Sequence, residues 1–181
     1  MPGSTAPDPH FCDGIFGLCS GLRVGQMSLA DLKLQAMGKK KPSPWWSQGI
    51  RFECQQSGNC CTSHGQYGYV YLTRKDRKNL AEFFQMTTRE FTKKYCARTD
   101  CYDHLVENGS PDCIYLSEKK CTVYEARPTQ CRTWPFWPEH MSAKRWNDDI
   151  QSFCPGVGKG KLHSAEFIRK QIAEQKKADS E

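Results

Sequence analysis

Thiol groups are the side chains of this sequence whose number and spacing suit a chemical role. Three of them lie in segment 52–61, where Cys60 and Cys61 are adjacent and Gly58 precedes them closely. Thiolates at short spacing beside glycine are what a soft metal ion or an iron–sulfur cluster requires. Four further thiols in three later segments complete a candidate set of metal ligands. The set is Cys54, Cys60, Cys61, Cys113, Cys121, Cys131 and Cys154.

The size of this set bears on the kind of metal centre. A structural zinc ion takes four ligands at about 2.3 Å from sulfur, so seven candidates exceed what one ion uses. Either some thiols are spare or the centre holds several metal atoms. Adjacent residues in extended backbone point to opposite sides, so we expect Cys60 and Cys61 to reach different metals or to bridge two. Gly58 and Asn59 suit a tight turn with positive φ before the pair.

The remaining cysteines and the chain as a whole indicate a reducing compartment. The 181 residues contain 11 cysteines, an odd number that argues against a fully paired secreted framework. We find no secretory signal and no apolar run of about 18 residues, and therefore expect a cytoplasmic protein outside the membrane. There, clustered cysteines more often bind metal than form disulfides. The roles of Cys12, Cys19, Cys96 and Cys101 stay open, as does a start of translation at Met27.

Other groups capable of chemistry are sparse. His64 follows Cys61 by three residues and could add a nitrogen ligand, although a lone loop histidine is more often a surface residue. The histidines at 104, 140 and 163 have no partner at metal-ligand spacing. We find no Ser/His/Asp order, phosphate-binding loop, dinucleotide fingerprint or zinc-protease motif. The sequence therefore leaves open whether the protein is an enzyme.

Basic and aromatic residues surround Cys131. Arg127 and Arg132 could screen thiolates or hold an anionic substrate, but we favour a structural pairing with carboxylates. The aromatic residues at 134, 136 and 137 could form a binding platform; packing over a metal site to exclude water is commoner. The net charge of +6 is spread along the chain, which makes nucleic acid an unfavoured partner.

The elements that must position these thiols are short helices and strands. Alternating tyrosines predict a strand over 66–72. Thr73 with Asp76 and Thr87 with Glu90 have capping-box spacing, which predicts helices over about 74–85 and from 88 toward 95. Two apolar runs, 112–116 and 121–124, predict a small hairpin with one cysteine on each strand. Prolines make 131–138 an ordered aromatic loop, and helical stretches are expected around 141–153 and from near Ser164.

These elements predict one α+β domain. We expect a small, irregular, cysteine-rich fold with short helices and a β-hairpin around a metal site, spanning 45–161. Residues 1–44 are expected to form a flexible extension with a short helix, and 162–181 a polar C-terminal helix and tail. Hydrophobic residues make up only 38%, so the core is modest and metal ligation is expected to contribute to stability.

Four segments, 52–61, 112–116, 121–132 and 153–156, resemble in order the YkgJ-type cysteine-cluster proteins, a bacterial family with a CxxCxxCC signature. The resemblance covers roughly residues 45–161. It implies a zinc- or iron-chelating domain. A similar domain is expected in a flagellin lysine methylase that carries an iron–sulfur cluster. The second signature cysteine falls at Ser57 here, which removes one potential ligand.

The sequence therefore predicts a metal-binding protein whose clustered thiolates hold zinc or an iron–sulfur cluster. Soft sulfur ligands suit zinc, copper(I) and iron–sulfur clusters alike, so the metal stays open. One alternative is an iron–sulfur-dependent redox or protein-modifying enzyme. Another is a zinc module that binds nucleic acid. No protein partner is indicated.

Overall fold

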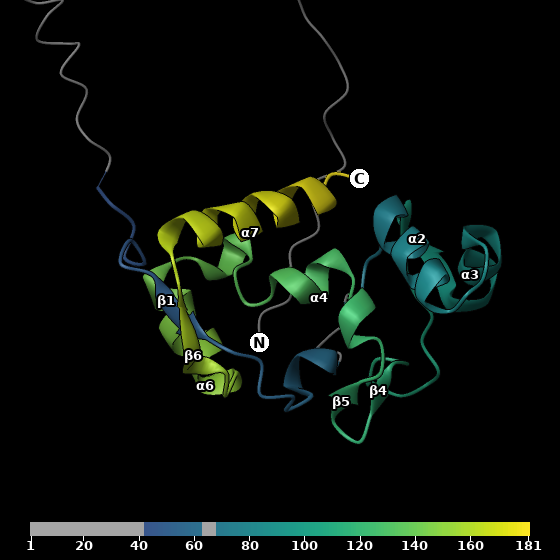
Figure 1. Ribbon diagram of the computed structural model, residues 1–181, viewed down its shortest axis with the longest axis horizontal. Helices are drawn as coiled ribbons and strands as arrows, with labels where there is room; N and C mark the ends of the chain where they lie inside the picture. The colour runs from purple at the N-terminus through teal and green to yellow at the C-terminus, as the bar shows by residue number, and fades with distance from the viewer. Residues whose placement is uncertain (1–41, 63–67) are drawn as a thin grey trace, which may run out of the picture. The chain divides into compact units, whose positions relative to one another are not determined.

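The computed structural model describes residues 42–62 and 68–181, and residues 45–181 belong to one compact unit. In this part of the chain, short helices alternate with three two-stranded antiparallel sheets, so the expected α+β class is confirmed (Figure 1). The elements follow in this order: β1 (Ile50–Phe52), η1 (Asn59–Cys61), α2 (Arg74–Phe83), α3 (Thr88–Tyr95), β2 (Cys96–Thr99), β3 (Tyr102–Leu105), β4 (Leu116–Ser117), β5 (Lys120–Cys121), η2 (Tyr124–Ala126), α4 (Thr129–Thr133), η3 (Pro138–His140), α5 (Ala143–Arg145), η4 (Trp146–Ile150), α6 (Gln151–Phe153), β6 (Val157–His163) and α7 (Ala165–Ala178).

Helices α2 and α3 begin where the capping boxes predict. At α2, the Thr73 hydroxyl accepts from the Asp76 backbone N–H at 3.1 Å, and the Asp76 carboxylate accepts from the Thr73 N–H at 3.1 Å. Thr87 and Glu90 form the same reciprocal pair at α3. These bonds satisfy donors that the first turn of a helix leaves unpaired. Both predicted helices are confirmed, although α2 ends slightly earlier than expected.

The strand predicted over 66–72 is wrong as a regular element in its described part. Only Tyr71 forms a β-bridge there, with His104 of β3. The side-chain amide of Gln130 occupies the place of a neighbouring strand, because its oxygen accepts from the Tyr71 N–H at 2.8 Å and its nitrogen donates to the Tyr69 carbonyl at 3.2 Å. The segment is therefore extended: Val70 and Leu72 form backbone hydrogen bonds with β3, while Tyr69 and Tyr71 bond to the Gln130 side chain.

The predicted cysteine hairpin is present but shorter than expected. Strands β4 and β5 have two residues each, joined at Glu118 and Lys119, which both have positive φ. Cys121 lies on β5, whereas Cys113 precedes β4. The segment 131–138, predicted as an aromatic loop, begins inside helix α4. Pro128 occupies the N-cap position of this helix, and its ring fixes the φ angle of Pro128.

The C-terminal half contains a helical run, a strand and a final helix. Elements α5, η4 and α6 form the helical stretch expected around 141–153, with a π-helical turn in its middle. Strand β6, which the sequence did not predict, pairs antiparallel with β1. Helix α7 begins after Ser164, whose hydroxyl accepts from the Phe167 N–H at 3.2 Å, as expected for the final helix.

Two hydrophobic clusters support this fold, and α4 lies between elements of both. The first core consists of Leu72, Leu80, Ala81, Phe91, Leu105, Tyr115 and Val123. The second core consists of Trp46, Ile50, Phe136, Trp146, Ile150 and Ile168. Because Ile168 is fully buried, the polar C-terminal helix α7 is anchored in the second core.

Some expectations fall on residues outside the described part. These are the N-terminal extension with its helix after Met27, the thiols of Cys12 and Cys19, and the ligand candidate His64. Within the described residues, no helix combines the length and apolar character needed to cross a membrane.

Candidate metal centre

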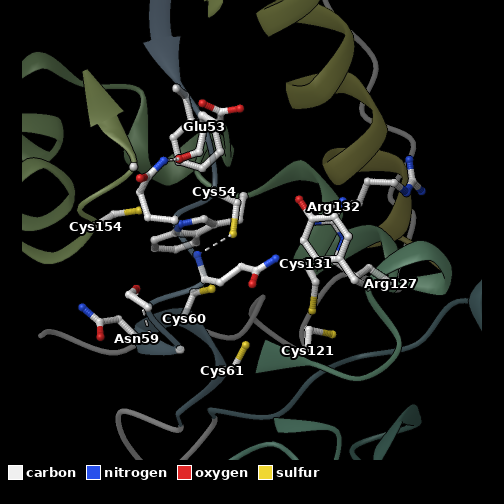
Figure 2. Close-up of a pocket in the computed structure, with 18 of the residues that line it drawn as sticks. Glu53, Cys54, Asn59, Cys60, Cys61, Cys121, Arg127, Cys131, Arg132 and Cys154 are labelled. Atoms are coloured by element: carbon white, nitrogen blue, oxygen red, sulfur yellow. Dashed lines mark hydrogen bonds between the residues drawn. The ribbon is translucent and has the colours of Figure 1, made fainter. Parts of the chain in front are cut away.

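All seven predicted ligand cysteines line one cavity of about 490 Å³. In Figure 2 the sulfur atoms of Cys54, Cys60, Cys61, Cys121 and Cys131 lie around the same space, with Cys154 near Cys54. Residues of both cores line the cavity: Tyr115 belongs to the first core and Phe136 to the second. None of the nine cysteines in the described residues forms a disulfide. Segments far apart in the sequence thus present free thiols to a common space.

Backbone hydrogen bonds join the cysteine segments to one another. The Cys113 N–H donates to the Cys61 carbonyl at 2.7 Å, which places the second segment beside the first. The Glu53 N–H donates to the Gly156 carbonyl at 3.1 Å, which places the last segment beside Cys54. A Cβ atom at position 156 would collide with the Glu53 carbonyl oxygen, so this approach requires glycine.

The turn that carries the adjacent cysteines differs from the extended backbone assumed for it. Gly58 has φ +78°, as expected, but Asn59 starts the 3₁₀ turn η1 instead of adopting positive φ. In a 3₁₀ helix successive side chains are about 120° apart, so Cys60 and Cys61 are not forced to opposite sides. Their thiols are hydrogen-bonded to each other and both line the cavity. The extended-backbone interpretation of this pair is therefore wrong.

Three of the thiols accept a hydrogen bond from the backbone N–H two residues further along the chain. These pairs are Cys54 with Gln56, Cys113 with Tyr115, and Cys121 with Val123. The nitrogen–sulfur distance at Cys54 is 3.5 Å. Amide donation of this kind stabilises negative charge on sulfur and orients the thiol, which is what a metal-binding thiolate requires.

The thiols influence one another electrostatically. Burial is the main cause that raises the pKa of Cys113 to about 11; the neighbouring Cys61 and Cys121 add to the rise, and the hydrogen bond from the Tyr115 N–H opposes it. Burial also raises the pKa of Cys131, with added repulsion from the same group. The hydrogen bond from Cys60 is the main cause of the raised pKa of Cys61. A cation bonded to the sulfurs reverses this balance because it favours their ionised form.

The two arginines near Cys131 have different roles. The guanidinium of Arg127 lies 3.4 Å from the centre of the Tyr124 ring, and its charge lowers the pKa values of nearby thiols. None of the ion pairs among the described residues involves Arg127, so the expected pairing with a carboxylate is wrong for this residue. Arg132 does form such a pair, with Glu174 of α7 at 2.9 Å.

Sequence reasoning missed several lining residues. His163 lines the cavity, and its Nε2 donates to the Phe52 carbonyl at 3.0 Å. No signal identified His163, because strand β6 was itself not predicted. Conversely, Cys96 packs against the first core and Cys101 is exposed in the β2–β3 turn, and neither lines the cavity.

The cavity suits soft metals by its donors, but its sulfurs do not form a compact single-ion site. Four thiolates around one zinc lie about 3.8 Å from one another, given Zn–S distances of about 2.3 Å. In the described residues, no three metal-binding side chains are gathered in this way. The expected metal site around the hairpin is thus not seen as a finished coordination sphere. The seven sulfurs surround a larger space.

A thiol-lined cavity in a small, lightly cored α+β fold defines a cysteine-cluster domain, and comparison with known proteins agrees. Residues 53–155 match the family described as "CxxCxxCC: Putative zinc- or iron-chelating domain", and the chain belongs to this family. An uncharacterized protein of Methanocaldococcus jannaschii, MJ0661, is 26% identical over 145 residues, covering 74% of this chain and 76% of that protein. No solved structure matches the chain.

Proposed function

We propose that this chain is a metal-binding protein in which cavity cysteines hold zinc or an iron–sulfur cluster. The observation that carries this proposal is that all seven predicted ligands line one cavity, although they come from four separate segments. Core packing alone does not account for seven free thiols that face a common cavity, three of them with a backbone N–H directed at the sulfur, whereas metal thiolates require this arrangement.

The donor set favours a soft metal. Sulfur supplies seven of the ligand atoms that line the cavity, while Glu53 is the one carboxylate and His163 the one imidazole among the described lining residues. Magnesium and calcium prefer oxygen ligands, so a wall with seven thiols favours a soft metal over either of them. We place the protein in the reducing cytoplasm because thiols that serve as ligands must stay reduced.

The number of sulfurs favours more than one metal atom. One tetrahedral ion uses four of the seven thiolates, and the adjacent Cys60 and Cys61 can bond to neighbouring metals. An iron–sulfur cluster or a polynuclear zinc site accounts for the larger number. Ser57, at the place of the second signature cysteine, also lines the cavity, and we assign it no ligand role.

Anaerobic purification followed by elemental analysis, sulfide determination and absorption spectroscopy tests this function. We expect more than one metal atom per chain. Colourless protein containing zinc selects the zinc form, and brown protein containing iron and acid-labile sulfide selects the cluster. Protein that retains less than one atom of any transition metal per chain, from cells supplied with zinc and iron, would contradict the proposal.

A further inference from the structure

The cavity is larger than a metal centre of one or a few atoms requires. Its volume is about 490 Å³. A water molecule accounts for about 30 Å³ of liquid, so even several metal and sulfide atoms of that size fill only part of the cavity. Cavities that bind small organic molecules measure about 300–1,000 Å³. The space is therefore sufficient for a second occupant beside the metal.

One part of the cavity wall is aromatic instead of sulfur-bearing. Trp134 and Trp137, which follow α4, line it with their ring centres 5.0 Å apart and their planes nearly perpendicular. Both indoles are half-buried, so each leaves part of its ring accessible. Indole faces and edges of this kind bind flat apolar groups.

The charged groups on the wall are mostly positive. Arg127, Lys119 and Lys161 line the cavity, and none of the three forms an ion pair with another described residue. Glu53 is the only acidic residue on the described wall. The stack on the Tyr124 ring holds the Arg127 guanidinium in place, so this charge is pre-organised for an anion.

Buried polar atoms of three lining residues also lack hydrogen-bond partners. Among the described residues, four buried side-chain nitrogen or oxygen atoms have no hydrogen-bond partner, and three belong to lining residues: Tyr115 Oη, Arg127 Nε and Trp134 Nε1. Buried polar atoms without a partner are rare and need an explanation. The Nε atom of Arg127 and the Nε1 atom of Trp134 are therefore not committed to another group of the described residues.

We propose that the cavity binds, beside the metal centre, a small organic anion with a flat apolar body. Its carboxylate or phosphate lies at Arg127, with Lys119 and Lys161 offsetting the negative charge of the nearby thiolates, and its body lies against Trp134 and Trp137. This proposal rests on the proposed metal centre for its position. It makes the protein a ligand-binding metalloprotein instead of a purely structural or storage module.

Four probes separate the two recognition elements in ligand-observed NMR titrations of the metal-loaded protein. Benzoate and phenyl phosphate combine a flat body with an anionic group; benzyl alcohol has the body alone and inorganic phosphate the charge alone. We expect at least one aromatic anion to bind saturably, about tenfold more tightly than either single-feature probe. The tighter of the two aromatic anions identifies the carboxylate or the phosphate as the natural group.

Matched variants locate the binding. Arg127→Met should weaken binding of the aromatic anion about tenfold, and Trp137→Leu should weaken it severalfold. Arg89→Met, an exposed arginine on α3 outside the cavity, should leave it unchanged. Far-ultraviolet circular dichroism confirms that each variant is folded, and the Trp137 variant keeps the test valid if the Arg127 variant fails to fold.

Metal content measured on the same samples distinguishes this proposal from the proposed function. The ligand proposal would be overturned if fully metal-loaded protein bound neither aromatic anion. It would also be overturned if the Arg127→Met variant bound both anions as tightly as the wild type does. Either result would leave Arg127 as a partner of the thiolates. If the purified protein retains less than one metal atom per chain, the metal content contradicts the metal centre, while binding of an aromatic anion that depends on Arg127 would still support the ligand.

Discussion

Cys61 is the thiol with the most connections to the rest of the candidate centre. Its carbonyl accepts from the Cys113 N–H, and its thiol is bonded to that of Cys60. The charges of Arg127 and Asp112 act on it with opposite sign. Any change at this position therefore alters the meeting point of two cysteine segments.

Cys61→Ser should lower metal content and thermal stability together, because a hydroxyl is a poor ligand for soft metals. Elemental analysis and the thermal unfolding midpoint measure the two effects on one sample. Cys101→Ser is the matched control, since Cys101 is exposed in a turn outside the cavity, and it should change neither quantity. Equal metal content in both variants would refute the ligand assignment at Cys61.

His140 makes stability depend on pH. Burial lowers the pKa of His140 to about 4 from 6.5, and its ring stacks on Trp137 with centres 5.1 Å apart. Between these two pH values the unfolded chain binds a proton that the folded chain does not. The contribution of His140 to the free energy of unfolding is therefore fully present above pH 6.5. It falls as the pH drops toward 4, by up to about 3 kcal/mol.

His140→Phe keeps the stacking and removes this titration. Urea unfolding of wild type and variant at about pH 7 and about pH 5 should show a smaller loss of stability in the variant, because only the wild type gains a proton at residue 140 on unfolding. Metal release in acid affects both proteins alike. An identical loss in the two proteins would show that His140 is not the group responsible.

Residue types and spacing identified seven thiols that line one cavity, but they did not distinguish the groups around them. Arg127 and Arg132 both flank Cys131, yet one stacks over Tyr124 and the other pairs with Glu174. The difference depends on α7, which lies far away in the sequence. Cys60 and Cys61 were assigned the wrong relative direction because their 3₁₀ turn is not evident from local sequence.

At the scale of elements, Asp76 joins the helix α2 to the helix α4 that carries Cys131. One carboxylate oxygen caps α2 at Thr73, and the other accepts from the Thr129 N–H and hydroxyl, both at 2.9 Å. The side chain is 1% exposed, so these hydrogen bonds are shielded from water. The position of Cys131 therefore depends on a residue in a different part of the chain.

Asp76→Ala should destabilise the protein by about 3 kcal/mol, because a cap and two buried charge-assisted hydrogen bonds are lost. It should also weaken metal binding, since Thr129 and with it α4 lose their anchor. Chemical unfolding measures the first effect, and competition with a chromophoric chelator measures the second. Glu90→Ala removes the same capping box from α3, away from the cavity, and should destabilise less without changing metal affinity. Equal loss of metal affinity in both variants would show that Asp76 acts only through overall stability.

Elements with local signals were predictable and those formed by distant pairing were not. Capping boxes gave the starts of α2 and α3, since their hydrogen bonds involve residues three apart. Strand β6 contains two glycines with positive φ and no apolar alternation, and it forms because β1 pairs with it. The β2–β3 hairpin turns at Asp100 and Cys101, which adopt positive φ without the usual Asn-Gly signal.

At the scale of the whole described unit, the cavity lies between the two hydrophobic cores, and the thiols come from segments belonging to both. Cys113 and Cys121 pack against the first core, whereas Cys154 follows the helical run that contributes Ile150 to the second. A metal bonded to both groups of sulfurs cross-links the cores. Structural zinc in small peptides contributes about 10–16 kcal/mol, comparable to the stability of a whole domain.

Metal removal should therefore loosen the cavity segments before it disrupts the helices of the first core. Amide hydrogen exchange with and without a chelator should show the largest loss of protection around η1 and residues 112–116, while α2 and α3 stay protected. Their capping boxes and the buried Leu80 and Phe91 do not depend on the thiols. Uniform loss of protection over the whole chain would contradict a centre located between two separately packed cores.

X-ray absorption at the edge of the metal found in the purified protein tests the central claim most directly. If the cavity cysteines hold the metal, its nearest neighbours are predominantly sulfur, at about the 2.3 Å typical of zinc thiolates. Nearest neighbours that are predominantly nitrogen or oxygen, at about 2.0–2.2 Å, would show that the thiols of this cavity are not the ligands.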